Sequence, residues 1–224
     1  MDNIKHISAL YRLHAPCGLP AAEIAAAEQR LGIRLPAALR EYLLALGGSE
    51  AVNQSFNRLL PLDKMDFDGD YLVLAEGNQG VFRCGIARAD LTQNNPPARI
   101  SFNIADANQW QPHLPSTRAL LLELACTNAT MGGLPYCANI MDEESADAQA
   151  VQFIQRNRNE IKELRQESQR FYTDGFHEII LLCFAENGNA SGVFIGTADQ
   201  NRFDTLLELF GRGNWLYTSY DDDE

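Results

Sequence analysis

The chain has 224 residues, of which 46% are hydrophobic and 21% charged, a composition typical of a globular protein rather than a disordered or fibrous one. Its 18 Lys and Arg against 30 Asp and Glu give a net charge of −12. A negative field of this size repels phosphate backbones and anionic lipids, so we expect no direct binding to nucleic acid or membrane. The charge would attract a basic protein partner, although acidity also serves solubility alone.

The cysteines are scattered through the sequence without a CxxC pair, and their positions are Cys17, Cys84, Cys126, Cys137 and Cys183. Three of them lie in apolar runs, where a free cysteine behaves as a small hydrophobic residue, so we expect no disulfide framework. The N-terminus lacks the apolar core of a signal peptide, and no segment approaches the roughly 18 apolar residues of a membrane helix. These features predict a cytoplasmic protein.

Two short helices are predicted near the N-terminus, each preceded by Leu-Pro and followed by glycine. The first begins after Pro20 and ends at Gly32, and the second begins after Pro36 and ends at Gly47-Gly48. Proline is tolerated at a helix start and glycine favours a helix end. The apolar residues at helical spacing are Ile24, Ala27 and Leu31 in the first helix and Leu39, Leu43 and Leu46 in the second.

From Tyr71 onward the pattern changes to short apolar runs bounded by turn residues. Residues 71–75 and 81–87 are predicted strands joined by a turn at 77–80, and a third strand is predicted at 99–104. Glycine and asparagine in that turn accept the positive φ that a hairpin requires. Leu114-Pro115 then opens another predicted helix, whose buried side is Leu120, Leu121, Leu124 and Ala125.

A long polar helix is predicted for residues 143–171, with a narrow apolar stripe at Val151, Ile154, Ile161, Leu164 and Phe171. Strands at 178–184 and 192–197, a helix at 203–210 and a last strand at 215–220 follow, before an acidic tail at 221–224. The segment from Ala185 to Phe194 echoes the one from Ala75 to Phe82. Two similar hairpins in one sheet would explain the echo, and an internal duplication stays open.

The stretch LAEGNQGVFRCGI, residues 74–86, offers glycines that could suggest a phosphate-binding loop. A phosphate loop of the Walker type needs Lys and Ser or Thr after its last glycine, followed by a helix. Here Gly80 leads into the strand-like residues 81–84, and Glu76 would place a negative charge beside the ligand. The sequence therefore favours a hairpin over nucleotide binding.

The sequence patterns required for metal binding and for catalysis are also absent. The cluster Asp66, Asp68 and Asp70 has no glycine and glutamate at the sixth and twelfth positions of a calcium loop. The histidines have no metal-ligand spacing, and no GxSxG motif occurs. A triad of Cys84, His177 and an aspartate could still assemble in space. We expect no catalytic residue, no metal and no cofactor, and therefore not an enzyme.

Two sequence blocks together resemble the SMI1/KNR4 (SUKH) superfamily. Residues 18–48 carry Glu28, Leu31-Gly32, Leu35-Pro36 and the pair Gly47-Gly48, which are similar to the family's opening motif. Residues 72–86 are similar to its hairpin motif. The sequence departs from these motifs in having Leu46 before the glycine pair and Cys84 in place of an aromatic residue. The match covers residues 18–87.

The resemblance implies an α+β fold, with a mixed, mainly antiparallel sheet and helices packed on one side, as a single domain over residues 1–224. Bacterial members of the family are predominantly immunity proteins that neutralise a cognate toxin, frequently a nuclease, by stoichiometric binding. The expected partner is thus a toxin protein, and a nuclease toxin would be basic because its site holds phosphate. Exposed acidic residues are the predicted partner-binding set: Asp66, Asp68, Asp70, Glu76, Asp221, Asp222 and Asp223.

Two alternatives to the immunity function remain. One is a regulatory or scaffold module acting through protein contacts, for which the polar helix 143–171 would be the docking surface. The other is a hydrolase with a spatially assembled triad.

Overall fold

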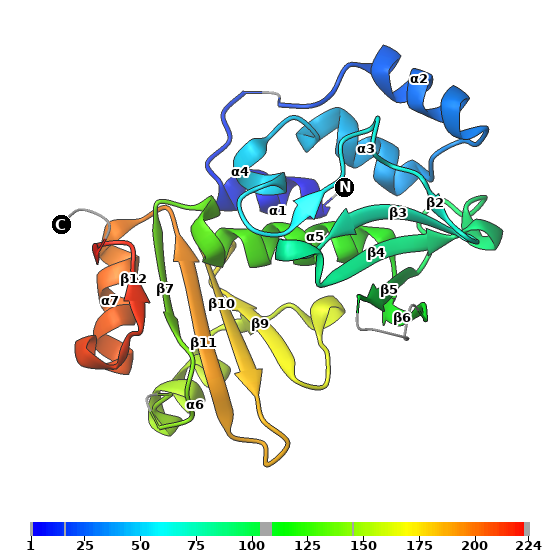
Figure 1. Ribbon diagram of the computed structural model, residues 1–224. Helices are drawn as coiled ribbons and strands as arrows, with labels where there is room; N and C mark the ends of the chain where they lie inside the picture. Colours follow the sequence, from blue (N-terminus) through cyan, green and yellow to red (C-terminus); the bar gives the residue numbers. More distant parts are fainter. Residues whose placement is uncertain (1, 16, 104–108, 145, 222–224) are drawn as a thin grey trace. The chain divides into compact units, whose positions relative to one another are not determined.

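The computed structural model describes residues 2–15, 17–103, 109–144 and 146–221. The chain divides into two compact units, which are treated separately here (Figure 1). The motif unit is formed by residues 15–124 and the C-terminal unit by residues 1–14 together with 125–224.

The motif unit combines helices with a six-stranded antiparallel sheet of order β1-β3-β4-β5-β6, in which β2 also pairs with β3. Its helices are α2 (Ala21–Leu31), α3 (Ala37–Leu46), α4 (Glu50–Asn53) and the first part of α5 (Thr117–Asn128). Its strands are β1 (Arg58–Leu59), β2 (Phe67–Asp68), β3 (Tyr71–Glu76), β4 (Phe82–Ala87), β5 (Ala98–Phe102) and β6 (Gln111–Leu114).

The two predicted helices near the N-terminus are confirmed as α2 and α3, and the prolines and the first glycine act as expected. Pro20 and Pro36 stand at the two N-caps. Gly32 ends α2 in the left-handed conformation, with φ of +66°, and its N–H donates to carbonyls of the last turn. The side chain of Glu28 then accepts a hydrogen bond from the N–H of Leu35 at 3.0 Å, which fixes the connection between the helices.

The predicted hairpin is confirmed as β3 and β4, paired from Tyr71↔Ala87 to Glu76↔Arg83. Its turn residues Gln79 and Gly80 have φ of +59° and +69°, the conformation that asparagine and glycine favour and glutamine tolerates less well. The third strand is confirmed as β5, although its predicted end, Ile104, lies outside the described residues. The helix predicted after Leu114-Pro115 is confirmed as α5.

The C-terminal unit contains a second antiparallel sheet of order β12-β7-β11-β10-β9-β8. Its strands are β7 (Tyr136–Ile140), β8 (Asn159–Glu160), β9 (Gln169–Thr173), β10 (Glu178–Phe184), β11 (Ala190–Thr197) and β12 (Tyr217–Thr218). Its helices are α1 (Asp2–Leu10), α6 (Ala148–Asn157), α7 (Gln200–Phe210) and the last residues of α5, which a π-helical segment (Ala129–Gly133) follows.

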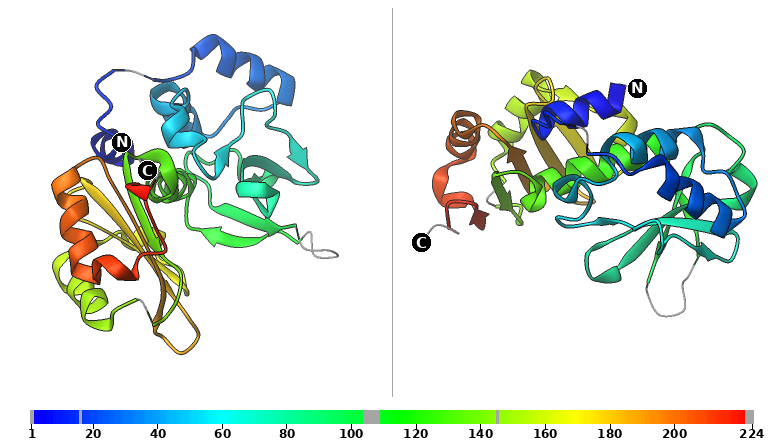
Figure 2. Two further views of the ribbon diagram at one scale, coloured as in Figure 1. Left: turned by 60° about the vertical axis from the view of Figure 1, so that its left-hand side comes forward. Right: turned by 90° about the horizontal axis from the view of Figure 1, so that it is seen from above.

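The core of the C-terminal unit lies between this sheet and two helices, α6 and α7, on the same face (Figure 2). Alternate residues of β10 and β11 face it, as the pleat of a strand requires, and meet apolar residues of both helices. Its residues include Ile154, Ile180, Leu182, Val193, Ile195, Phe203 and Phe210. The predicted strands at 178–184 and 192–197 and the helix at 203–210 are confirmed as β10, β11 and α7, and the strand at 215–220 in part as β12.

The prediction of one helix over residues 143–171 is wrong. Among the described residues of this range, only 148–157 form an α-helix, α6, after which the chain enters β8, a 3-10 turn (Lys162–Leu164) and β9. The apolar stripe is buried throughout, but Phe171 is buried as a strand residue that pairs with Leu181 of β10. Since three consecutive residues of β9 are buried, the strand shows no alternation in sequence, and its apolar spacing fits a helix by coincidence.

The α+β class and the antiparallel pairing are confirmed, and the strands form two sheets rather than one. The two echoing segments are hairpins, β3–β4 and β10–β11, but they belong to different sheets. The single family domain over residues 1–224 stays a prediction. The strands at the edges of both sheets are short: β1, β8 and β12 have two residues each, and β6 has four, including Pro112.

Candidate protein-binding surface

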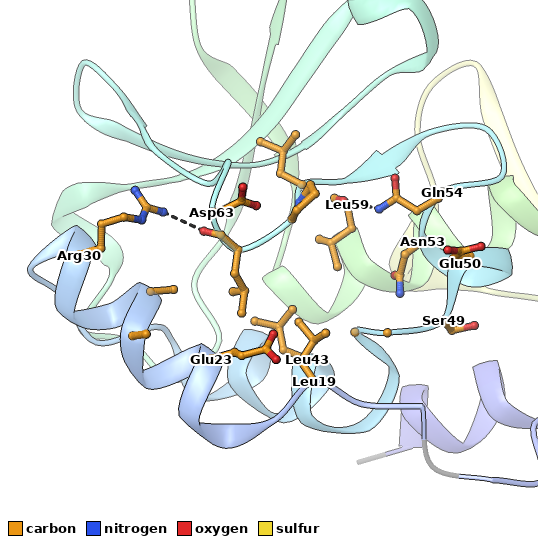
Figure 3. Close-up of a pocket in the computed structure, with 17 residues that line it drawn as sticks. Leu19, Glu23, Arg30, Leu43, Ser49, Glu50, Asn53, Gln54, Leu59 and Asp63 are labelled. Atoms are coloured by element: carbon orange, nitrogen blue, oxygen red, sulfur yellow. Dashed lines mark hydrogen bonds between the residues drawn. The ribbon is translucent and has the colours of Figure 1, made fainter.

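A groove of about 680 Å³ opens on the surface of the motif unit (Figure 3). It lies between α2 and the segment that follows β1, with α4 at one end. Its volume lies within the roughly 300–1,000 Å³ typical of binding sites. Its lining is predominantly apolar and contains Leu19, Leu43, Leu59, Leu60, Leu62, Ala26 and Ala27.

Arg30 joins the two long walls of the groove. From the last turn of α2, its guanidinium donates hydrogen bonds to the carbonyl oxygens of Leu62, at 2.8 Å, and Met65, at 2.6 Å. Charged donors make stronger hydrogen bonds than neutral ones. The arginine therefore holds the segment after β1 at a fixed distance from α2, and its charge is engaged by protein carbonyls.

The floor of the groove depends on a close backbone approach between residues 17–19 and the end of α3. The N–H of Leu19 donates to the carbonyl of Leu43 at 2.8 Å, and the N–H of Gly48 donates to the carbonyl of Cys17 at 2.7 Å. A β-carbon on Gly18 would lie 1.7 Å from the carbonyl oxygen of Leu44. Glycine is therefore required at position 18, because no side chain fits between the two segments.

The short helix α4 is fixed by a buried polar pair. Tyr42 donates its hydroxyl hydrogen bond to the side-chain oxygen of Asn53 at 2.7 Å, and the amide of Asn53 donates to the carbonyl of Leu46 at 2.7 Å. Gln54 also donates to the carbonyl of Leu59, at 2.7 Å. Both Tyr42 and Asn53 are buried, so these hydrogen bonds avoid the free-energy cost of burying polar groups without partners.

Three carboxylates surround the apolar lining: Glu23 from α2, Glu50 from α4 and Asp63 from the segment after β1 (Figure 3). All three residues are exposed. The groove can thus provide apolar contact and negative charge, a combination suited to holding a protein segment. Across the described part of the chain, no three His, Cys, Asp or Glu residues are arranged to hold a metal ion.

The predicted acidic cluster gathers at the β2–β3 turn of the motif unit. Asp66 and Asp70 are exposed. Asp68 is half-buried, pairs with Arg83 at 3.1 Å and accepts a hydrogen bond from the indole of Trp110 at 3.2 Å. Its charge is therefore largely compensated within the protein, which leaves Asp66 and Asp70 as the members of the cluster most accessible to a partner.

The other predicted acidic residues lie elsewhere. Glu76 ends β3, at the opposite end of the strand from Tyr71 and thus about 17 Å away along it, and pairs with Arg58 at 3.0 Å. Asp221 belongs to the C-terminal unit, where its carboxylate accepts a hydrogen bond from the N–H of Thr218. Asp222 and Asp223 lie outside the described residues.

The candidate nucleophile Cys84 is buried inside the sheet of the motif unit, whereas His177 belongs to the C-terminal unit. Burial, together with the nearby charge of Glu123, raises the pKa of the Cys84 thiol well above its ordinary value. Because the thiolate is the nucleophile, a thiol held protonated in this way is inert. The buried, protonated thiol of Cys84 therefore gives the triad hypothesis no support.

Sequence reasoning missed the groove, although several residues that build it had been singled out. Gly18, Glu28 and the pair Gly47-Gly48 were noted for their place in a motif rather than for what they hold together. The second wall of the groove is hidden from the sequence, because Leu60 to Asp63 follow the two-residue strand β1, which has no periodicity to reveal it.

The model of the SMI1 / KNR4 family (SUKH-1) matches residues 18–210. No curated protein and no solved structure matches the chain. None of the helices in the described ranges has the length and apolar character needed to cross a membrane.

Proposed function

The chain belongs to the SMI1/KNR4 (SUKH-1) family, and from this membership we propose that it is a bacterial immunity protein that neutralises a cognate toxin by stoichiometric binding in the cytoplasm. The family match over residues 18–210 is the observation that carries the proposal. It extends far beyond the two motifs from which the resemblance was first drawn.

The net charge of −12 supports a basic toxin as the partner. A nuclease site that holds phosphate is positively charged, and an acidic inhibitor can occupy it without any chemical step. Complementary charge also accelerates association, by about 10- to 1,000-fold at low salt. Rapid capture matters for a protein that must reach the toxin before the toxin reaches its target.

The test is coexpression with the cognate toxin, which for an immunity protein is expected to be the product of the neighbouring gene directly upstream. Cells that produce both proteins should grow, and the two should copurify as a stable complex. Titration of purified toxin activity should end at a fixed molar ratio of the two proteins. Failure to bind or protect would overturn the proposal, and protection by a small fraction of one equivalent would favour the enzyme alternative instead.

The acidic cluster at the β2–β3 turn provides a second test. Reversing Asp66 and Asp70 to lysine should slow association with the toxin at low salt, because these exposed carboxylates would contribute to steering. Asp68 is left unchanged, since it pairs with Arg83. An unchanged association rate would remove the cluster from the interface without affecting the proposed function.

The scaffold alternative has lost its expected docking surface. It relied on a continuous polar helix over residues 143–171, and α6 is the only α-helix among the described residues of that range.

A further inference from the structure

We propose that the groove of the motif unit is the toxin-binding site and that it takes an apolar segment of the toxin flanked by Lys or Arg. This inference rests on the proposed function, because it assigns the surface through which that function would act. Three features of the groove carry it: the apolar lining, the fixed walls and the sign of the surrounding charge.

The lining offers apolar surface that the chain itself leaves open. Leu19, Leu60 and Leu62 are half-buried, and Ala26 is exposed, above a floor formed by buried Leu43. Covering such surface is the main source of affinity at the centre of an interface. An apolar side chain of a partner would complete the packing that these residues begin.

The walls are ordered before any partner arrives. Arg30 fixes the segment after β1, the Gly18 contact fixes the floor, and Asn53 fixes α4. Less conformational entropy is lost when a binding surface is already fixed. The groove is therefore suited to binding a partner without first rearranging. Residues of the family's opening motif form the framework that holds it.

The surrounding charge identifies the chemistry of the occupant. In the described part of the chain neither Glu23 nor Glu50 has an ion-pair partner, and the only ion pair of Asp63 is with the adjacent Lys64, at 3.8 Å. The single cation of the lining, Arg30, already donates to two carbonyls. A segment with Lys or Arg beside its apolar residues would pair with these carboxylates, whereas a second copy of this chain, with its charge of −12, would be repelled.

Filling the groove tests its role without disturbing the core. Ala26 lines the groove from the exposed side of α2, so Ala26→Trp should occupy the space and weaken binding of the neighbouring gene's toxin at least tenfold. Ala25→Trp is the matched control, because Ala25 is exposed on the same helix but does not line the groove. Toxin binding that survives equally in both variants would overturn the proposal.

Charge reversal tests whether the carboxylates around the groove attract the basic residues of the toxin. The pair Glu23→Lys and Glu50→Lys should reduce the association rate about tenfold at low salt and little at high salt. The pair Glu167→Lys and Glu186→Lys changes the net charge equally at exposed positions of the C-terminal unit and should have a much smaller effect. Equal effects of the two pairs would show that net charge alone acts, and would contradict the assigned site.

A random peptide library displayed on phage provides a probe that does not depend on the toxin. Selection on the unaltered protein should enrich apolar peptides that contain Lys or Arg, and Ala26→Trp but not Ala25→Trp should abolish their binding. No enrichment, or enriched peptides without basic residues, would overturn the inference. A toxin that fails to bind the unaltered protein would instead refute the proposed function, so the two failures are distinguishable.

Discussion

Replacing Gly18 by alanine would test whether the close backbone contact at the floor of the groove stabilises the motif unit. Gly18 does not have a positive φ, so alanine could adopt its backbone conformation without intrinsic strain. The cost would come from the neighbouring backbone alone. The new β-carbon would lie 1.7 Å from the carbonyl oxygen and 2.3 Å from the carbonyl carbon of Leu44.

The expected destabilisation follows from the separation that this contact requires. Ordinary van der Waals contact begins at 3.4 Å, so residues 17–19 must move away from α3 by more than about 1 Å. The hydrogen bonds from Leu19 and Gly48, now 2.8 and 2.7 Å long, would be lost at about 1 kcal/mol each. Strain from overpacking adds about 1–3 kcal/mol, so we expect a loss of about 3–5 kcal/mol in the free energy of unfolding.

The assay is urea unfolding monitored by tryptophan fluorescence. The chain has two tryptophans, Trp110 in the motif unit and Trp215 in the C-terminal unit, so a Trp215→Phe background reports the motif unit alone. Thr92→Ala is the control, because Thr92 is exposed in the same unit as Gly18 and Trp110, and it should change the free energy by less than about 0.5 kcal/mol. A loss below about 1 kcal/mol for Gly18→Ala would refute the steric argument.

Three further predictions concern the C-terminal unit. Glu178 is 1% exposed and pairs with Arg158 at 2.5 Å. Glu178→Gln should therefore lower the free energy of unfolding in urea by about 2–3 kcal/mol, because it leaves a largely buried guanidinium without a counter-charge. A loss below about 1 kcal/mol would contradict this reasoning. The pKa of Asp199 is lowered by the backbone N–H of Arg202 at the start of α7, so its stabilisation is present above its ordinary pKa of 3.8 and is lost as the pH falls through the lowered value. Urea midpoints between about pH 5 and pH 2 should therefore fall less in Asp199→Asn than in the unaltered protein, and parallel curves would argue against it. Burial raises the pKa of Cys183 to about 11. At about pH 8, iodoacetamide should therefore label Cys183 at least about a hundredfold more slowly than it labels free cysteine, as measured by mass spectrometry. Labelling at the rate of free cysteine would show that the thiol is not buried.

Elements with strong local signals could be predicted from the sequence. For α2 and α3, the apolar spacing, the preceding prolines and the following glycines all indicate the same structure, so local preference and tertiary packing agree. The β3–β4 hairpin could be predicted equally well, since glycines at its turn mark where the chain reverses. In these segments the information lies within a few residues along the chain.

Elements that depend on distant partners could not be predicted in the same way. Residues 169–173 fold as a strand because β9 hydrogen-bonds to β10, and the spacing of Ile161, Leu164 and Phe171 does not reveal that pairing. The two-residue strands β1 and β2 have no periodicity at all. Tertiary hydrogen bonding decides the structure of such segments over local propensity.

The candidate site could be predicted from the sequence only in part, for a similar reason. Charge and exposure could be inferred for Asp66 and Asp70, but the pairing of Asp68 with Arg83 joins residues that lie apart in the sequence. The groove requires the segment after β1 to meet α2 through Arg30. No composition or spacing predicts contacts of this kind, although the family motif marks many of the residues that make them possible.

The short strands at the sheet borders have a consequence for how this protein behaves at high concentration. A long exposed border strand offers a row of free N–H and C=O groups onto which another chain can add, and this is a common route to aggregation. The two-residue strands β1, β8 and β12 offer almost no such row, and Pro112 removes a donor from β6. Both sheets are thereby protected from joining to other copies, which favours side-chain surfaces over strand addition as the means by which this chain recognises a partner.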